Sequence, residues 1–74
     1  MFEKTKIDLG KKITEIRKIK NISQEKLGEI SGLHRTYVGS VERGERNISI
    51  EAISKICKAL GIKLEDLFKG INIK

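Results

Sequence analysis

The feature that most constrains this sequence is a pair of short apolar patterns separated by a glycine. Leu27 and Ile30 lie three residues apart, as do Val38 and Val41, and each pair forms an apolar stripe at helical spacing. Gly32 lies between the two stripes, where a first helix should stop, because glycine accepts the left-handed backbone that commonly ends helices. This part of the chain therefore predicts two short helices joined by a tight turn.

The net charge of the chain indicates which kind of partner such a helix pair binds. The 74 residues include 16 Lys and Arg against 10 Asp and Glu, a net charge of +6, and the isoelectric point is about 9.7. This surplus favours a polyanionic partner, with nucleic acid first and an anionic membrane surface second, although it also fits a basic protein with no such partner. Together with the helix pair over residues 23–44, it predicts a helix-turn-helix that binds double-stranded DNA.

Length and cysteine content limit the architecture. A chain of 74 residues suits one small core, so we expect residues 1–74 to form a single helix-turn-helix domain. The lone Cys57 can form neither an internal disulfide nor a metal site, which predicts a reduced, cytoplasmic chain with Cys57 as a small core residue. No apolar run is long enough for a signal peptide or a membrane span.

The sequence contains no nucleophile–base constellation, phosphate loop or metal-ligand spacing. We therefore expect that the protein is not an enzyme and that it binds no metal and no cofactor. Membrane-surface binding is also disfavoured, because the basic residues do not form one amphipathic helix with a large apolar face.

Apolar spacing and capping residues predict a compact all-α fold of five helices. The expected ranges are 6–20, 24–31, 35–42, 50–60 and 64–68. Thr5, Ser23 and Ser49 are the expected N-caps of the first, second and fourth helices, whereas His34 is a poor cap for the third.

Other residues are expected to end helices or to bring them together. Asn21, Gly61 and Gly70 are the expected stops after the first, fourth and fifth helices. Gly28 lies in the middle of a helix, at a cost of about 1 kcal/mol relative to alanine. We expect that it is kept there because the following helix passes close to its backbone.

Three segments resemble a known family: IRKIKNISQEKLGEISGL, HRTYVGSVERGERNIS and AISKICKALGIKLEDLF, within residues 9–68. They are similar to the phage-repressor-like helix-turn-helix domains of the Xre or Cro/C1 type. The second segment looks like the controller proteins of bacterial restriction-modification systems, which are small dimeric regulators. The resemblance implies a transcription regulator that binds operator DNA as a dimer.

The resemblance also implies roles for individual residues. The helix that begins at Arg35 would enter the major groove. Implied base contacts are Arg35, Thr36, Tyr37 and Ser40. Implied contacts with the DNA backbone are Gln24, Arg43, Arg46 and Asn47. Arg17 and Glu42 are implied to form an internal ion pair. The expected dimer interface draws on Leu64, Leu67, Phe68 and Ile71, although core packing must claim at least some of them.

Several of these roles have an alternative. Arg35 can fork two donors to O6 and N7 of guanine, or it can contact a phosphate and read no base. The Tyr37 ring can simply pack beside Val38. Helix capping by Ser23 alone can explain the residues around Gln24. A second function of another class also fits the resemblance, because the same fold serves as the antitoxin that binds a toxin protein.

Overall fold

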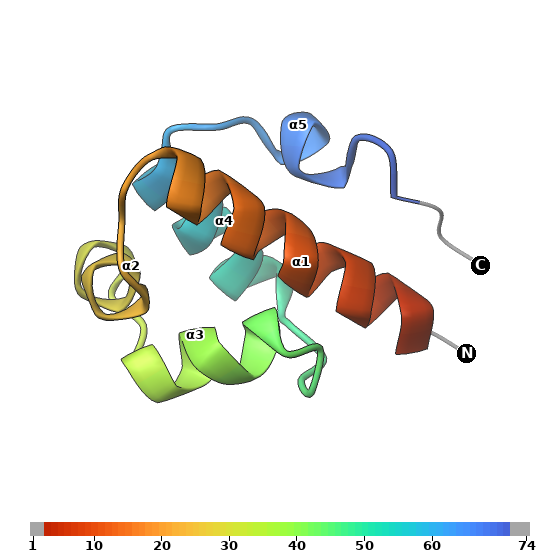
Figure 1. Cartoon of the computed structure of the whole chain (residues 1–74), viewed down its shortest axis with the longest axis horizontal. Helices are drawn as coiled ribbons and strands as arrows, with labels where there is room; N and C mark the ends of the chain where they lie inside the picture. Colours follow the sequence, from red (N-terminus) through yellow and green to blue (C-terminus); the bar gives the residue numbers. More distant parts are fainter. Residues whose placement is uncertain (1–2, 72–74) are drawn as a thin grey trace.

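Five α-helices form the fold of residues 3–71, the part of the chain that this computed structural model describes (Figure 1). They are α1 (Glu3–Ile19), α2 (Gln24–Ser31), α3 (Arg35–Glu42), α4 (Ile50–Leu60) and α5 (Leu64–Phe68). The predicted all-α class is confirmed. Within the described residues, none of these helices is both long enough and apolar enough to cross a membrane.

Helix α1 begins earlier than the sequence predicted. It starts at Glu3 rather than Lys6, so Thr5 lies inside the helix and the prediction of Thr5 as N-cap is wrong. Side-chain ion pairs support the added turn, since Lys6 lies 3.5 Å from Glu3 and Lys4 lies 3.6 Å from Asp8. The other four helices have the predicted bounds.

The N-caps explain where α2, α3 and α4 begin. The Ser23 and Ser49 hydroxyls accept backbone N–H bonds from Lys26 at 3.0 Å and from Ala52 at 3.1 Å, as predicted. The expectation that His34 would cap poorly is wrong, because its Nδ1 accepts the Thr36 N–H at 3.0 Å. A neutral imidazole carries one ring nitrogen that can accept in the same way as an aspartate or asparagine oxygen.

The stops after the helices also follow the sequence closely. Asn21 has φ 56° and follows the end of α1, and Gly61 has φ 69° and caps α4. Helix α5 is capped by Lys69 in an extended conformation, and Gly70 follows with φ 84°. The predicted stop at Gly70 is therefore one residue late.

The core lies between α1 and the other four helices. Helix α3 lies on one side of α1 and α5 on the other (Figure 1). The buried cluster comprises Leu9, Ile13, Leu27, Val38, Val41, Ile53, Ile56, Cys57, Leu60 and Leu67. Burial raises the pKa of the Cys57 thiol, as expected for a small core residue. Leu67 is fully buried within this chain, in agreement with the expectation that core packing claims part of the predicted dimer set.

Two glycines allow α3 to approach its neighbours closely. A Cβ at Gly28 would lie 2.6 Å from the Leu33 carbonyl oxygen, so the predicted close approach at α2 is confirmed. A Cβ at Gly10 would lie 2.5 Å from the Val41 carbonyl oxygen and 2.6 Å from that of Glu42. Backbone therefore meets backbone at both ends of α3, which sets the position of this helix against α1 and α2.

Candidate nucleic-acid interface

The N-terminal end of α3 is its most accessible part. Arg35 and Thr36 are exposed, while Val38 and Val41 anchor the opposite side of the helix in the core. Ser40, an implied base contact, is buried, and so is Gly39 beside it. A Cβ on Gly39 would lie within 3.5 Å of the Gln24 amide oxygen, because α2 packs against this part of the helix.

A buried ion pair holds the C-terminal end of α3. Arg17 on α1 contacts Glu42 through two bonds, Nε to Oε2 at 2.7 Å and Nη2 to Oε1 at 3.0 Å. The side chains are only 10% and 4% exposed. The Arg17 Nη1 also donates to the Ile22 carbonyl oxygen at 2.9 Å. This pair joins α1, the α1–α2 connector and α3 at one point.

The surroundings of Glu42 keep its carboxylate ionised. Burial on its own raises the pKa of Glu42, but hydrogen bonds from Arg17 and Gln24 and the Arg17 charge lower that pKa overall. Gln24 donates from Nε2 to Glu42 Oε1 at 2.8 Å. The amide expected at a DNA phosphate is thus already bonded within the protein, at the N-terminus of α2.

Arg35, the first residue of α3, carries an exposed ion pair. Its Nη1 lies 2.6 Å from Oε2 of Glu25 on α2, and the two side chains are 64% and 70% exposed. Thr36 beside it is exposed, and its backbone N–H donates to His34 Nδ1. Because an exposed pair of this kind is held weakly, Arg35 remains available to a competing anion.

Arg43 is paired in a similar way in the connector after α3. Its Nε lies 2.9 Å from Glu45 Oε2, and the hydrogen bond and charge of Glu45 raise the Arg43 pKa. The same bond from Arg43 lowers the pKa of Glu45. Both side chains are exposed by more than half, at 58% and 56%.

Tyr37, Ser40 and Arg46 form a single cluster. The Tyr37 ring is half-buried and packs against the core, and the Arg46 guanidinium carbon lies 5.2 Å from its centroid. The Arg46 Nε also donates to the Ser40 hydroxyl at 3.0 Å. Beside this cluster is an open hollow of about 400 Å³, lined by Ser40, Glu45, Arg46 and Asn47. The structure therefore brings four of the predicted contact residues together.

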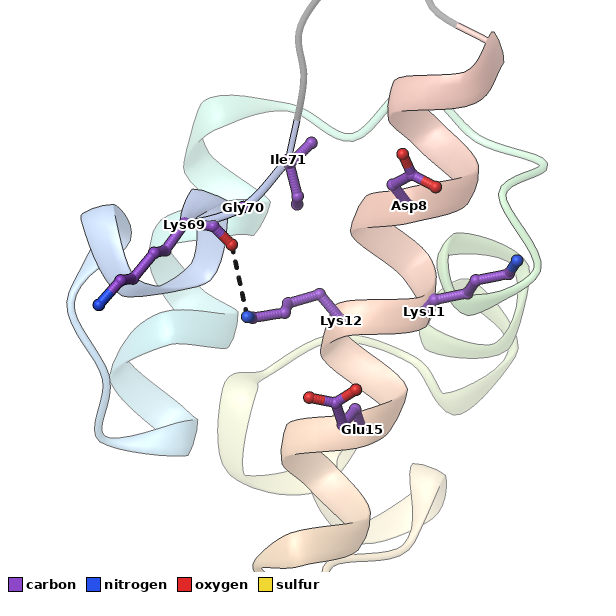
Figure 2. A pocket seen from close by; sticks show the side chains of 7 residues that line it. All are labelled: Asp8, Lys11, Lys12, Glu15, Lys69, Gly70 and Ile71. Carbon is purple, nitrogen blue, oxygen red and sulfur yellow. Dashed lines mark hydrogen bonds between the residues drawn. The ribbon is translucent and has the colours of Figure 1, made fainter.

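A second hollow, of about 270 Å³, lies between α1 and the chain after α5 (Figure 2). Lys12 reaches across it and donates from Nζ to the Lys69 carbonyl oxygen at 3.4 Å. Ile71, expected at a dimer interface, lines this hollow and is half-buried against the core. The hollow mixes lysines with Asp8 and Glu15, so its walls have no single sign of charge.

The partners of the arginines were not found from the sequence. The sequence analysis assigned no role to Glu25 or Glu45, yet each forms an ion pair with an arginine of the candidate interface. Their sequence separations from those arginines, ten and two residues, match no regular helical spacing. The only signal for these pairs in the sequence is the presence of acidic residues not far from the arginines.

Comparison with known families identifies the class of protein. The helix-turn-helix family model (HTH_3) matches residues 13–67, which include the helix pair and the buried ion pair. The chain belongs to this helix-turn-helix family of DNA-binding regulators.

Individual relatives narrow the class further. The control protein C.BamHI of Bacillus amyloliquefaciens is 47% identical over 74 residues, 99% of this chain and 91% of that protein. The control protein C.SmaI of Serratia marcescens is 46% identical over 66 residues, 89% of this chain and 79% of that one. The crystal structure of the restriction-modification controller protein C.AhdI from Aeromonas hydrophila has a TM-score of 0.85 and 45% identity, over 86% of this chain and 97% of that one. These matches confirm the resemblance to controller proteins.

Proposed function

We propose that this protein is a cytoplasmic transcription regulator that binds operator DNA as a homodimer, as a controller protein of a restriction-modification system. It acts by binding and has no catalytic role. Arg35 and Thr36 contact bases in the major groove. Arg43 and Asn47 contact phosphates, and Gln24, at the N-terminus of α2, contacts the DNA backbone as well.

One observation carries this proposal most directly. The exposed end of α3 presents Arg35 and Thr36, while its far end is locked by the Arg17–Glu42 pair. A reading helix must hold its angle while its exposed side chains meet the groove. The similarity to control proteins, and the net charge of +6, agree with this arrangement.

Selection of bound sequences from a random pool of duplex DNA tests the proposal. We expect a two-fold symmetric site with half-sites about 34–36 Å apart, or a multiple of that distance. The described chain measures 31 × 22 × 21 Å, so two adjacent copies suit such a spacing. Affinity should fall steeply with salt yet stay well above that for random DNA. Equal affinity for all sequences would contradict the proposal.

The homodimer has its own test. On α5, Leu64 is 48% exposed, and Phe68 is half-buried beside an apolar groove of about 210 Å³. We expect Leu64→Glu to shift the protein from dimer to monomer in sedimentation measurements, because the charge would be buried between copies. Ile19→Glu is the matched control, since Ile19 is also exposed but lies at the far end of α1. If Leu64→Glu leaves the dimer intact, the interface lies elsewhere.

A further inference from the structure

The connector after α3 folds back against that helix. The Glu45 N–H donates to the Ser40 carbonyl oxygen, and the Gly44 N–H donates to the Val41 carbonyl oxygen, each at 3.0 Å. These backbone bonds to the last turn of α3 turn the chain sharply. Arg46 is therefore brought beside Ser40, a residue six positions earlier.

Arg46 is held from two directions. Its Nε donates to the Ser40 Oγ at 3.0 Å, and its guanidinium carbon lies 5.2 Å from the centroid of the Tyr37 ring. The Ser40 hydroxyl gives its own proton to the Tyr37 carbonyl oxygen at 2.8 Å, so its lone pairs remain for Arg46. Ser40 is only 8% exposed. Its hydroxyl thus already takes part in two hydrogen bonds within the protein.

Arg46 differs from Arg35 and Arg43 in its ion-pair partners. Arg35 and Arg43 face Glu25 and Glu45 at 2.6 Å and 2.9 Å. Within residues 3–71, no carboxylate lies at ion-pair distance from Arg46. With Nε occupied, its two terminal nitrogens still carry four N–H donors. Arg46 is one of the residues that line the open hollow of about 400 Å³ beside α3.

We infer that Ser40 and Tyr37 are positioning residues that hold Arg46 as a preformed fork for a pair of adjacent acceptor atoms on DNA. This inference rests on the proposed function. Ser40 then contacts no base itself. It supports DNA binding by holding Arg46 in place. A preformed guanidinium fork loses less side-chain freedom on binding than a free one. The acceptors are either O6 and N7 of one guanine or two phosphate oxygens.

A double-mutant cycle on the selected operator tests the inference. Ser40→Ala should weaken binding about threefold to tenfold, because Arg46 must then be ordered on binding. Arg46→Ala should weaken it about tenfold to a hundredfold, because charge-assisted bonds are lost. The double variant should bind as Arg46→Ala does. If Ser40→Ala costs the same in both backgrounds, Ser40 contacts DNA itself and the inference is overturned. Thermal unfolding of each variant separates binding loss from unfolding.

Operator variants identify the acceptor pair. A loss with Arg46→Ala that is confined to one base pair per half-site assigns the fork to a guanine, and an equal loss on all sequences assigns it to phosphates. Either pattern supports the inference, and no loss at all overturns it. For Tyr37, replacement by Phe keeps the ring and should weaken binding less than Tyr37→Leu, which removes it. Equal losses in the two variants would contradict a positioning role for the ring.

A measurement without DNA keeps the inference separate from the proposed function. In the free protein, the Arg46 Nε–H should exchange slowly with solvent and show a ring-current shift from Tyr37 in its NMR spectrum. Ser40→Ala should speed the exchange, and Tyr37→Leu should remove the shift. An Arg46 Nε–H unaffected by both substitutions would overturn the inference even if the operator is found. If no operator is found, this readout still decides whether Arg46 is positioned.

Discussion

Two kinds of arginine–glutamate pair flank the same helix, and they differ in burial rather than in distance. The nitrogen–oxygen distance is 2.7 Å for Arg17–Glu42 and 2.6 Å for Arg35–Glu25. The first pair is almost entirely buried, with side chains 10% and 4% exposed. The second is 64% and 70% exposed. Equally short contacts therefore have different physical consequences.

Burial decides what each pair can do. If Glu42 is removed, Arg17 keeps a charge that water reaches poorly, so the loss is large. If Glu25 leaves Arg35, water or a phosphate replaces it at little cost. The buried pair ties α3 to α1, and in the proposed complex the exposed pairs would release their arginines to DNA.

The largest expected effect comes from breaking the buried pair. Glu42→Ala should lower the free energy of unfolding by about 3–5 kcal/mol, because it strands the Arg17 charge. Urea unfolding followed by circular dichroism measures this loss. Glu45→Ala is the matched control and should leave the melting temperature unchanged, since Glu45 is exposed. An unchanged unfolding curve for Glu42→Ala would show that the pair does not hold the fold.

Acid should destabilise the fold through the buried pair. The native pKa of Glu42 is lowered from the usual value of 4.5. As the pH falls below that value, the unfolded state takes up the proton first, so stability is lost through the native pKa. Unfolding measured from pH 7 to pH 3 should show this decline. Glu42→Gln should be less stable at neutral pH and should flatten the curve. A decline of the same size in Glu42→Gln would assign it to other carboxylates.

Arg35, in the exposed pair at the start of α3, should affect the base preference of DNA binding and have little effect on stability. Arg35→Ala should relax the preference at one base pair per half-site by about 1–3 kcal/mol, since a guanine would lose two donors. Competition binding with single-base variants of the operator measures this change, and the melting temperature should stay close to that of the wild type. A loss shared equally by all sequences would make Arg35 a phosphate contact instead.

The smallest effect is expected in the connector. Arg43→Ala should weaken binding evenly across sequences and reduce the slope of log affinity against log salt by about 1, because one phosphate contact is lost. Titrations at several salt concentrations measure that slope. A change in sequence preference would move Arg43 into the group of base-reading residues.

Local patterns in the sequence were sufficient for most of the fold. Apolar spacing, together with capping serines at α2 and α4, predicted the bounds that α2, α3 and α4 have, because these signals lie within one or two turns of each helix. Gly28 was interpreted correctly as a close approach. The start of α1 was missed because ion pairs in its first turn, such as Lys6–Glu3, extended the helix past the expected cap.

The candidate site was less predictable than the fold. Its residues were named from a family resemblance, but the partners of those residues were not. Ser40 was expected on the surface, yet it is buried beneath Arg46. His34 was expected to cap poorly, yet its ring nitrogen takes the place of a shorter polar side chain. Both errors arose because local propensity does not specify how a side chain turns.

The sequence by itself determined the helices, the basic charge and the family, because periodicity, capping and composition are properties of neighbouring residues. The family resemblance implied an internal pair for Arg17 and an outward role for Arg35, and the tertiary structure added the physical difference between them, a side chain that is 10% exposed against one that is 64% exposed. Arg17 and Arg35 have the same chemistry, and each lies near a glutamate. Their difference is access to water, and access to water is set by how α1, α2 and α3 pack together.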